Sequence, residues 1–446
     1  MTQPVTRSGG NPLPTPGTSP SSALTGSDAA APPRVLLGVS GGVAAYKACE
    51  ILRLLRSAGA DVVVVPTPAA LKFVGSATFE ALSGHPVATD VFTDVHNVAH
   101  VATGQEADLV VIAPATADLL ARAAAGRADD LLTATLLVTR APVLMAPAMH
   151  SEMWTHPSTV DNVATLRRRG TFVLDPAVGR LTGADSGVGR LPEPEHIVSA
   201  ALLLLRRPDA LPRDLVGRRV LVTAGGTREA LDPVRYLGNR SSGKQGFAIA
   251  LAAVARGAQV TVIAANTALA APPGVTVVEV TDARDLQRQV QAHVGSADAV
   301  VMAAAVADFR PAAVVESKIK KQDGRGPAPI QLLTNPDILA ELGAQRTGQR
   351  PVIVGFAAET GDENGSVLDH GRAKLARKGC DLLVVNRVGP GRAFEVEDNA
   401  ATILAADGSE PVQVAFGPKI DLAAAICDLV AERLTRLDSG DREQFA

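Results

Sequence analysis

The sequence predicts two successive α/β domains, each a parallel β-sheet with helices on both faces. Short runs of Val, Ile and Leu without polar alternation recur along the chain, as expected of strands that are buried on both faces. A strand followed by a glycine-rich turn begins at Arg34, and a second such opening comes at residues 218–227. Because this second opening lies so far along the chain, it indicates a second domain and not a continuation of the first.

Composition excludes several classes of protein. The 446 residues suit about two or three domains, and 46% hydrophobic residues are too many for a wholly disordered chain. A net charge of −3 with only 3% aromatic residues argues against a nucleic-acid partner. The three cysteines are far apart in the sequence, so they predict no disulfide framework and fit a reducing, cytoplasmic location.

Composition also sets the expected domain limits. The first residues are rich in Pro, Ser, Thr and Gly and have no apolar core of the kind a signal peptide needs. A charge-free stretch at 257–278 is interrupted by Asn266, Pro272 and Gly274, so it predicts two strands and a turn and not a membrane span. The expected parts are a disordered tail at 1–33, a first domain at 34–205, a linker at 206–217, a second domain at 218–436 and a tail at 437–446.

The expected strands follow one another in both domains. After the first strand and its turn, a helical stretch leads to a second run that ends at Pro66. Further runs of the first domain are 108–114, 141–147 and 171–174, and those of the second are 218–227, 258–266, 275–280, 298–308, 351–359 and 380–386. The stretch 309–330 has no clean periodicity and carries Lys318, Lys320 and Lys321. A loop of this length in a compact domain is usually functional or disordered.

The first glycine turn, GVSGGVAAYK at 38–47, predicts an anion site, because glycines between a strand and a helix let backbone amides approach a phosphate. It is not GxGxxG, and no acidic residue ends the next strand at Val65, which disfavours an NAD site and leaves a mononucleotide phosphate. The alternative is a tight structural turn. The small residues of 113–118, with Thr116 as a donor, likewise fit either a ligand or a plain strand-to-helix turn.

Three further motifs leave alternatives open. His96 and His100 are four residues apart but lack the glutamate of HExxH, so His100 is either a general base or a structural histidine, and a metal ligand is disfavoured. The glycine-rich segment 179–194 suits a mobile flap. GNRSSGKQG at 238–246 nearly matches a P-loop, but Gln245 replaces the hydroxyl residue, so phosphate binding remains while Walker-type ATPase chemistry is rejected.

Taken together, these motifs resemble one family over residues 34–435. GVSGGVAAYK, APATAD and PAM resemble a flavin-dependent cysteine decarboxylase. VTAGGTREALDPVRYLGNRSSGKQG, AAAVADFRP, KIKK, NPDIL and GFAAET resemble a ligase. The sequence is therefore similar to the bacterial bifunctional phosphopantothenoylcysteine decarboxylase/phosphopantothenate–cysteine ligase of coenzyme A biosynthesis. The resemblance implies an N-terminal Rossmann-like flavoprotein domain followed by a second Rossmann-like α/β ligase domain.

For the first domain, the resemblance implies FMN-dependent decarboxylation of 4′-phosphopantothenoylcysteine to 4′-phosphopantetheine. His100 matches the catalytic base, and Met149 and His150 match the substrate-binding segment. The positions that match flavin contacts are Ser40, Gly41, Gly42, Ser76, Thr78, Phe79, Pro114 and Thr116. Two positions depart from the family pattern. His150 stands where the family has an asparagine that holds the substrate carboxylate, and the flap has no cysteine as proton donor, the nearest matches being Thr182 and Gly183. Without this donor, either the decarboxylase releases an enethiol, or Asp185 or solvent supplies the proton instead.

For the second domain, the resemblance implies CTP-dependent coupling of cysteine to 4′-phosphopantothenate through an acyl-cytidylate, with Mg²⁺ on the triphosphate. Lys318 matches the lysine that assists cytidylate formation, and Arg235 and Asn239 match residues of the acyl-cytidylate step. The positions that match CTP-binding residues are Met302, Ala303, Ala304, Asp308, Lys318, Asn335, Pro336, Asp337, Ile338, Phe356, Lys374 and Lys378. The resemblance leaves the protein ligands of the metal unknown.

The resemblance also implies homo-oligomers, with a trimeric flavoprotein half and a dimeric ligase half, and small molecules as the other partners. Two alternative functions were weighed. An NAD(P) oxidoreductase would need GxGxxG and an acidic strand end, and neither follows the first strand of either domain. A non-catalytic flavin-binding regulator would fit the missing flap cysteine, but the complete ligase motifs argue against it for the whole chain.

Overall fold

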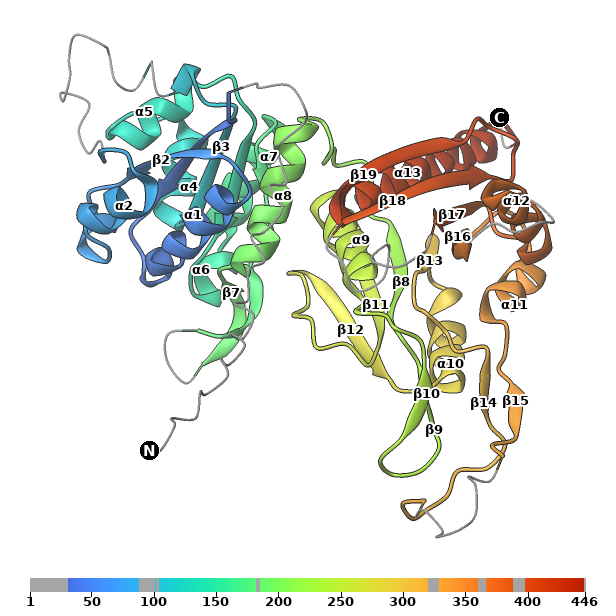
Figure 1. The fold of residues 1–446 in the computed structure, drawn as a ribbon. Helices are drawn as coiled ribbons and strands as arrows, with labels where there is room; N and C mark the ends of the chain where they lie inside the picture. Colours follow the sequence, from blue (N-terminus) through green and yellow to red (C-terminus); the bar gives the residue numbers. More distant parts are fainter. Residues whose placement is uncertain are drawn as a thin grey trace, which may run out of the picture.

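The chain folds into two α/β halves, each built on its own parallel sheet (Figure 1). A computed structural model describes residues 31–87, 101, 104–181, 185–319, 329–359, 366–387 and 398–444. His100, Thr182, Gly183, Lys320 and Lys321 therefore lie outside the described residues. None of the described helices is both long and apolar enough to cross a membrane.

The first half has a five-stranded parallel sheet in the order β2-β1-β3-β4-β5. Its strands are β1 (Arg34–Val39), β2 (Asp61–Pro66), β3 (Leu109–Ala115), β4 (Val143–Pro147) and β5 (Phe172–Val173). Its helices are η1 (Val43–Lys47), α1 (Ala48–Ser57), η2 (Ala70–Lys72), α2 (Ser76–Ser83), α4 (Ala117–Ala125), α5 (Leu131–Val138), α6 (Ser151–Thr155), α7 (Pro157–Arg168) and α8 (Pro194–Arg206). Because β2 and β3 lie on opposite sides of β1, the strand order reverses there, and ligands bind at such a point in open α/β sheets.

The second half has an eight-stranded sheet in the order β12-β11-β8-β13-β16-β17-β18-β19. Its strands are β8 (Arg219–Gly225), β11 (Gln259–Ala265), β12 (Val275–Val280), β13 (Ala299–Met302), β16 (Val352–Glu359), β17 (Leu382–Arg387), β18 (Asp398–Ala405) and β19 (Val412–Pro418). The helices are α9 (Lys244–Ala255), α10 (Ala283–Val294), α11 (Ile338–Gln345), α12 (Val367–Lys378) and α13 (Lys419–Gln444). The first six strands in this order are parallel to one another. β18 pairs antiparallel with β17, and β19 pairs antiparallel with β18. The order reverses between β8 and β13, which places a second ligand-binding position there.

Each sheet is covered on both faces, as the unbroken apolar runs predict. In the first half, α1 and α8 pack on one face, and α4, α5 and α7 pack on the other. In the second half, α9 and α13 cover one face, and α10, α11 and α12 cover the other. The expectation of two Rossmann-like α/β domains is confirmed. The expected two strands and a turn at 257–278 are β11 and β12.

Short antiparallel pairs occur where the sequence predicts only loops. The segment 179–194 contains part of a hairpin of β6 (Ala177–Arg180) and β7 (Ser186–Arg190). β9 (Arg228–Ala230) pairs with β10 (Tyr236–Gly238), and β14 (Phe309–Pro311) pairs with β15 (Leu332–Thr334). The last two pairs, which we call the arms, project from the second sheet (Figure 1). The run 298–308 is a strand only to Met302, because the chain leaves the sheet at that point.

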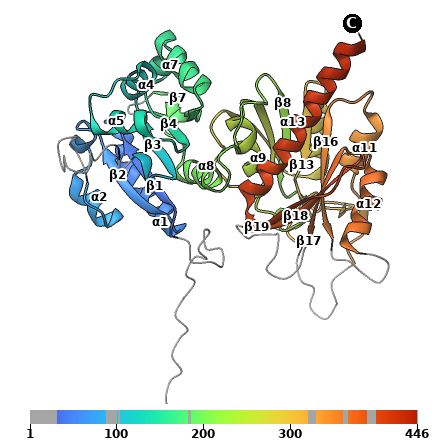
Figure 2. The same cartoon turned by 90° about the horizontal axis from the view of Figure 1, so that it is seen from above.

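Ion pairs and a shared core join the two halves. Figure 2 shows α8 of the first half beside the second half, and its last residue, Arg206, pairs with Asp421 of α13 at 2.7 Å. The buried guanidinium of Arg256 contacts Asp214 of the connecting segment and Asp428 of α13. The core of α1 and α8 continues through Leu211 and Leu215 into α9 and α13.

The C-terminal helix is longer than the sequence predicts. α13 runs to Gln444, so the part of 437–446 up to that residue is helical and the expected tail is wrong there. The reason is that Asp438 pairs with both Arg218 and Arg350. These two arginines hold the helix against the second sheet beyond the last apolar contact of α13.

Candidate active sites

The first candidate site lies where the strand order reverses between β1 and β3. Ser40, at the end of β1, is buried, and its Oγ donates a hydrogen bond to the carbonyl of Pro114 at 2.7 Å. The same Oγ accepts a hydrogen bond from the amide of Thr116 at 2.9 Å. Thr116 in turn caps α4, its side chain accepting from the amide of Leu119. Three of the predicted flavin contacts therefore form one rigid link between neighbouring strands.

The turn after Ser40 leaves backbone amides unpaired. The amides of Gly41, Gly42 and Val43 have no hydrogen-bond partner among the described residues, and no side chain caps η1 at Gly42. A Cβ on Gly41 would clash with Ala69, so only glycine lets the chain pass at this point. Consecutive free amides at the start of a helix form an anion-binding cradle.

The remaining predicted flavin contacts are on α2, and they do not share one environment. Ser76 is half-buried, Thr78 is exposed, and Phe79 is completely buried in the core of the first half. The side chain of Phe79 therefore packs against α1 and β2 residues and is not available to a ligand. A motif match identifies a position along the sequence of a helix, but it does not show whether that side chain faces the core or a ligand.

The segment after β4 lies under the β6–β7 hairpin. The amide of Met149 donates to the carbonyl of Gly189 at 2.9 Å, and Oγ of Ser151 donates to the carbonyl of Val188 at 2.6 Å. A Cβ on Gly189 would collide with the carbonyl of Met149, so this close approach requires glycine. His150, between the two links, has its Nδ1 atom 3.3 Å from Oδ2 of Asp185.

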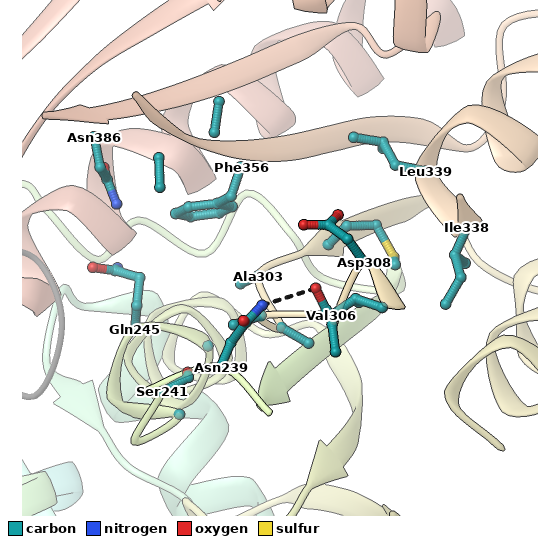
Figure 3. A pocket seen from close by; sticks show the side chains of 18 of the residues that line it. Asn239, Ser241, Gln245, Ala303, Val306, Asp308, Ile338, Leu339, Phe356 and Asn386 are labelled. Atoms are coloured by element: carbon teal, nitrogen blue, oxygen red, sulfur yellow. Dashed lines mark hydrogen bonds between the residues drawn. The ribbon is translucent and has the colours of Figure 1, made fainter. Parts of the chain in front are cut away.

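The second candidate site is a cavity of about 490 Å³ at the carboxyl ends of the second sheet. Figure 3 shows Asp308 on the right, Gln245 and Asn386 on the left, and Phe356 above Asn239 between them. The cavity is lined by Asn239 and by nearly all the predicted CTP-binding residues. These are Met302, Ala303, Ala304, Asp308, Asn335, Pro336, Asp337, Ile338, Phe356, Lys374 and Lys378. Of the predicted ligase residues, Lys318 and Arg235 do not line it.

Hydrogen bonds fix the wall of this cavity near β13. Nδ2 of Asn239 donates to the carbonyl of Val306 at 2.9 Å (Figure 3). Asn335 is buried, and its side chain donates to the carbonyl of Ala307 at 2.8 Å and accepts from Arg310. The side chain of Asn335 is therefore paired within the protein, where it holds the wall of the cavity in place.

Charged groups gather at the α11 end of the cavity. Asp337 caps α11, accepting from the amide of Ala340 at 3.1 Å, and pairs with Lys378. Burial works against ionisation of this carboxyl, but the hydrogen bonds from Lys378 and the amide of Ala340, together with the positive charges of Lys378 and Arg377, outweigh it and lower the pKa of Asp337 below its usual value. Lys374 lies one helical turn before Lys378 and also lines the cavity. The arrangement suits a polyanion.

Arg235 and Lys318 are brought together on the arms, outside the cavity. The buried carboxylate of Asp232 accepts hydrogen bonds from the amides of Val234 and Arg235, both at 2.8 Å, and from the amide of Ile319 at 3.1 Å. Burial opposes ionisation, but these three amides and the charge of Arg235 hold the pKa of Asp232 below its usual value. Arg235 also donates to the carbonyl of Ile319 at 3.3 Å, so it lies beside the exposed segment that carries Lys318.

Several cavity residues were missed by the sequence analysis. Nε2 of Gln245 donates to the carbonyl of Lys419, and Oε1 accepts from Asn399 at 3.2 Å. Lys419 is buried, and Oδ1 of Asn386 is buried without a hydrogen-bond partner among the described residues. Three of these residues come from strands and a helix at the far end of the chain, where no motif drew attention to them. The sequence did offer one signal for a site residue, a polar residue near the end of an apolar strand, such as Asn386 in β17.

The described residues contain no group of three or more His, Cys, Asp or Glu side chains that could hold a metal ion.

Comparisons with known proteins match both halves. A family model for the DNA/pantothenate metabolism flavoprotein C-terminal domain matches residues 215–434, and a flavoprotein model matches 25–205. The chain is 63% identical over 413 residues to the coenzyme A biosynthesis bifunctional protein CoaBC of Mycobacterium tuberculosis, covering 92% of this chain and 98% of that protein. It is 42% identical over 404 residues to the protein of the same name from Vibrio cholerae, covering 90% and 98%.

Solved structures give partial matches. A crystal structure of the C-terminal domain of a CoaBC protein has 34% identity and a TM-score of 0.42, covering 50% of this chain and 99% of that one. A crystal structure of the FMN-dependent cysteine decarboxylase SpaF has 35% identity and a TM-score of 0.35, covering 40% and 98%.

Proposed function

The chain belongs to the family of the coenzyme A biosynthesis bifunctional protein CoaBC, and from this premise we propose which residues of each half carry the chemistry. It is a phosphopantothenate–cysteine ligase and a phosphopantothenoylcysteine decarboxylase. The observation that carries this conclusion is 63% identity over 98% of the length of a curated relative, with a family model on each half.

In the ligase half, we propose that the cavity binds CTP against the α11 and α12 lysines. The carboxylate of 4′-phosphopantothenate attacks the α-phosphorus of CTP, so that pyrophosphate leaves and an acyl-cytidylate forms. The amine of cysteine then displaces CMP. Lys374 and Lys378 would neutralise the triphosphate, because fixed cations stabilise charge that develops during such a transfer. Mg²⁺ would arrive with the nucleotide, since the described residues offer it no cluster of ligands.

Lys318 and Arg235 would complete this site from the arms. They are next to one another because Asp232 ties the turn at 231–235 to the 319 segment. Both lie outside the cavity of a single copy. A cation that is carried on an arm can approach the α-phosphate only when the arm lies over a nucleotide. We propose that this closed arrangement is the reactive one.

In the decarboxylase half, we propose that FMN binds with its phosphate on the amides of Gly41, Gly42 and Val43. The residues present fit this group, because the three amides find no partner in the part of the chain that the structure describes and lie at a helix start. Bound FMN supplies two-electron redox chemistry at the thiol-bearing carbon of the substrate. Ser40 and Thr116 would hold the adjoining strand ends in place. His100, placed by sequence alone, would act as the base.

We also propose that copies of the chain associate through the arms, giving the dimer expected of the ligase half. The strands of the arms and the loops that join them expose large apolar side chains to solvent. These are Val234, Tyr236, Phe309, Val314, Val315, Ile319, Ile330, Leu332 and Leu333. Exposed apolar patches of this kind mark interaction surfaces. Leu332→Asp should lower the mass measured by analytical ultracentrifugation, and an unchanged mass would contradict the dimer. The trimer of the flavoprotein half and the cytoplasmic location remain expectations of the same kind.

The proposed function is tested by supplying the purified chain with 4′-phosphopantothenate, cysteine and CTP without oxygen. We expect CMP, pyrophosphate, carbon dioxide and 4′-phosphopantetheine in equal amounts, with a flavin absorbance spectrum for the protein. Release of CMP without carbon dioxide would contradict the decarboxylase assignment. Failure to consume CTP while added 4′-phosphopantothenoylcysteine is still decarboxylated would contradict the ligase assignment.

A further inference from the structure

The decarboxylase reaction needs a proton, for which the sequence analysis names Asp185 or solvent in place of a flap cysteine. When carbon dioxide leaves the cysteinyl carbon of 4′-phosphopantothenoylcysteine, the electron pair of the broken C–C bond must take up one proton to give 4′-phosphopantetheine. We propose that His150, oriented by Asp185, delivers this proton. The inference rests on the proposed decarboxylase function and names a residue that acts within it.

The position of His150 in the fold fits this role. It follows β4 by three residues, and β4 is the neighbour of β3, whose end carries Pro114 and Thr116. The amide of Ala148 donates to the carbonyl of Ala115 at 3.1 Å, which keeps the two strand ends together. Because the carboxyl ends of parallel strands share one edge of the sheet, His150 lies on the same edge as the amides of the proposed flavin site.

The contact with Asp185 orients the imidazole ring. Nδ1 of His150 is 3.3 Å from Oδ2 of Asp185, and both side chains are about half exposed, at 48% and 50%. A carboxylate at Nδ1 fixes the tautomer and orientation of a histidine, so the proton that can be transferred is the one on Nε2. His150 is then the group that donates to the substrate, and Asp185 is a positioning residue.

The backbone holds the two residues in this relation. Asp185 immediately precedes β7, and β7 is attached to the His150 segment on both sides, through Met149 to Gly189 and through Ser151 to Val188. Glycine at 187 and 189 allows this approach, because a Cβ at either position would collide with Ser151 or Met149. The His150–Asp185 contact is therefore built into the way the hairpin packs and not left to two long side chains.

The proposed step balances without a further reactant. The N–H bond at Nε2 of the imidazolium breaks and a C–H bond forms at the carbon that lost carbon dioxide. The ring becomes neutral and regains its proton from water before the next turnover. No net oxidation or reduction of the substrate results, in agreement with the overall exchange of carbon dioxide for a proton.

The test uses the full chain with its flavin, 4′-phosphopantothenoylcysteine as substrate, and no oxygen. Carbon dioxide and thiol products are quantified separately by mass spectrometry. We expect His150→Gln to release carbon dioxide but to lower the ratio of 4′-phosphopantetheine to carbon dioxide about 100-fold, the usual contribution of a general acid. A product two hydrogens lighter should accumulate in its place. Asp185→Asn should lower the same ratio about 10-fold, and Asp185→Glu should restore it.

Ser151→Ala is the matched control, because it removes the other side-chain link between this segment and the hairpin. We expect the product ratio of this variant to equal that of the unmodified chain. The flavin absorbance spectrum and thermal midpoint of each variant should also be unchanged, which separates proton delivery from damage to the fold. Failure of the unmodified chain to release carbon dioxide would instead refute the proposed function itself.

Three results would overturn the proposal. One is an unchanged product ratio in His150→Gln. Another is an equal fall in carbon dioxide and thiol product, which would place His150 in an earlier step. The third is a Ser151→Ala variant that behaves like Asp185→Asn, which would reduce the pair to a structural link.

Discussion

Each half of the molecule begins with a strand and a glycine turn at the point where its strand order reverses, yet the two turns use their backbone amides differently. In the first turn, the amides of Gly41 and Gly42 have no partner among the described residues. In the second, the amide of Gly226 donates to the carbonyl of Ala265 and that of Thr227 to the carbonyl of Ala305. Thr227 Oγ1 also accepts from the amide of Ala307.

The comparison teaches that a glycine turn alone does not identify a phosphate site. In the second half, glycine is needed because the chain crosses its neighbour closely. Gly225 has a φ of +86°, and a Cβ there would collide with the carbonyl of Ala265. In the second half, the segment that we expect to bind phosphate is the next loop, where Ser241, Ser242 and Gly243 precede α9 and line the cavity. What decides the role of a turn is which of its amides remain unpaired.

The two halves also differ in where their charged groups lie. The largest expected effect on a reaction rate comes from a charged group that lies outside the cavity. Lys318 lies on an arm that only the ligase half possesses. Lys318→Gln should lower the rate of pyrophosphate release about 1000-fold, because a fixed cation near the reacting phosphate contributes on that order. The rate is measured with 4′-phosphopantothenate and CTP. Decarboxylation of added 4′-phosphopantothenoylcysteine serves as the control and should not change, and normal pyrophosphate release would remove Lys318 from the site.

Gly225→Ala tests whether the second turn needs glycine for close packing. The added methyl group meets the carbonyl of Ala265 at a positive φ, so we expect the free energy of unfolding of the ligase half to fall by about 3 kcal/mol. Gly348→Ala is the control, since Gly348 also has a φ of +86° but nothing lies near its Cβ position. That variant should lose only about 1 kcal/mol. Equal losses in urea denaturation would mean that backbone conformation, and not the close crossing, explains the glycine.

Gly42→Asp tests the role of the first turn. A Cβ at Gly42 meets only Thr116, at 3.4 Å, so the backbone can accept a side chain there. The added carboxylate would repel an anion at the free amides, and we expect flavin affinity to fall about 100-fold. Gly42→Ala should retain most of the affinity, which is measured by flavin fluorescence on titration. If both variants bind flavin equally, the phosphate is not on this turn.

The smallest expected effect is on stability and concerns Asp232, whose carboxylate links the two arms by accepting from the amides of Arg235 and Ile319. The pKa of Asp232 is lowered from its usual 3.8, so its ionised form stabilises the folded state at higher pH. That stabilisation is complete above pH 3.8 and is lost as the pH falls through the lower folded-state value. The difference in thermal midpoint between the unmodified chain and Asp232→Asn should therefore shrink below pH 3.8.

Much of the fold could be predicted from the sequence because buried parallel strands have a simple signature. The runs ending near Pro66, Ala115 and Pro147 are strands, and the second set of runs forms the second sheet. The short pairs of the arms could not be predicted, because three-residue strands such as 309–311 carry no periodicity. The extension of the C-terminal helix beyond residue 436 could not be predicted either, since it depends on Asp438 meeting two distant arginines.

The candidate sites were predicted unevenly for the same reason. The motif positions around Asp308, Asn335 and Lys378 meet in one cavity, although Asp308 comes after β13 of the sheet, Asn335 follows β15 of an arm and Lys378 ends α12. Phe79 matches a motif position but points into the core. Lys419 was missed because it reaches the cavity from the start of a helix far from any motif. Sequence gives positions along elements, while side-chain direction and distant partners depend on packing.

Amide hydrogen exchange tests the contrast between the two turns most directly. We expect removal of flavin to speed exchange in a peptide that covers residues 40–44. Exchange at 225–228 should be slow in the free protein and unchanged when CTP and 4′-phosphopantothenate are added, while exchange at 241–246 should slow. Fast exchange at 225–228 that becomes slow only with the nucleotide would contradict the account, because it would show that the second glycine turn binds the ligand through free amides.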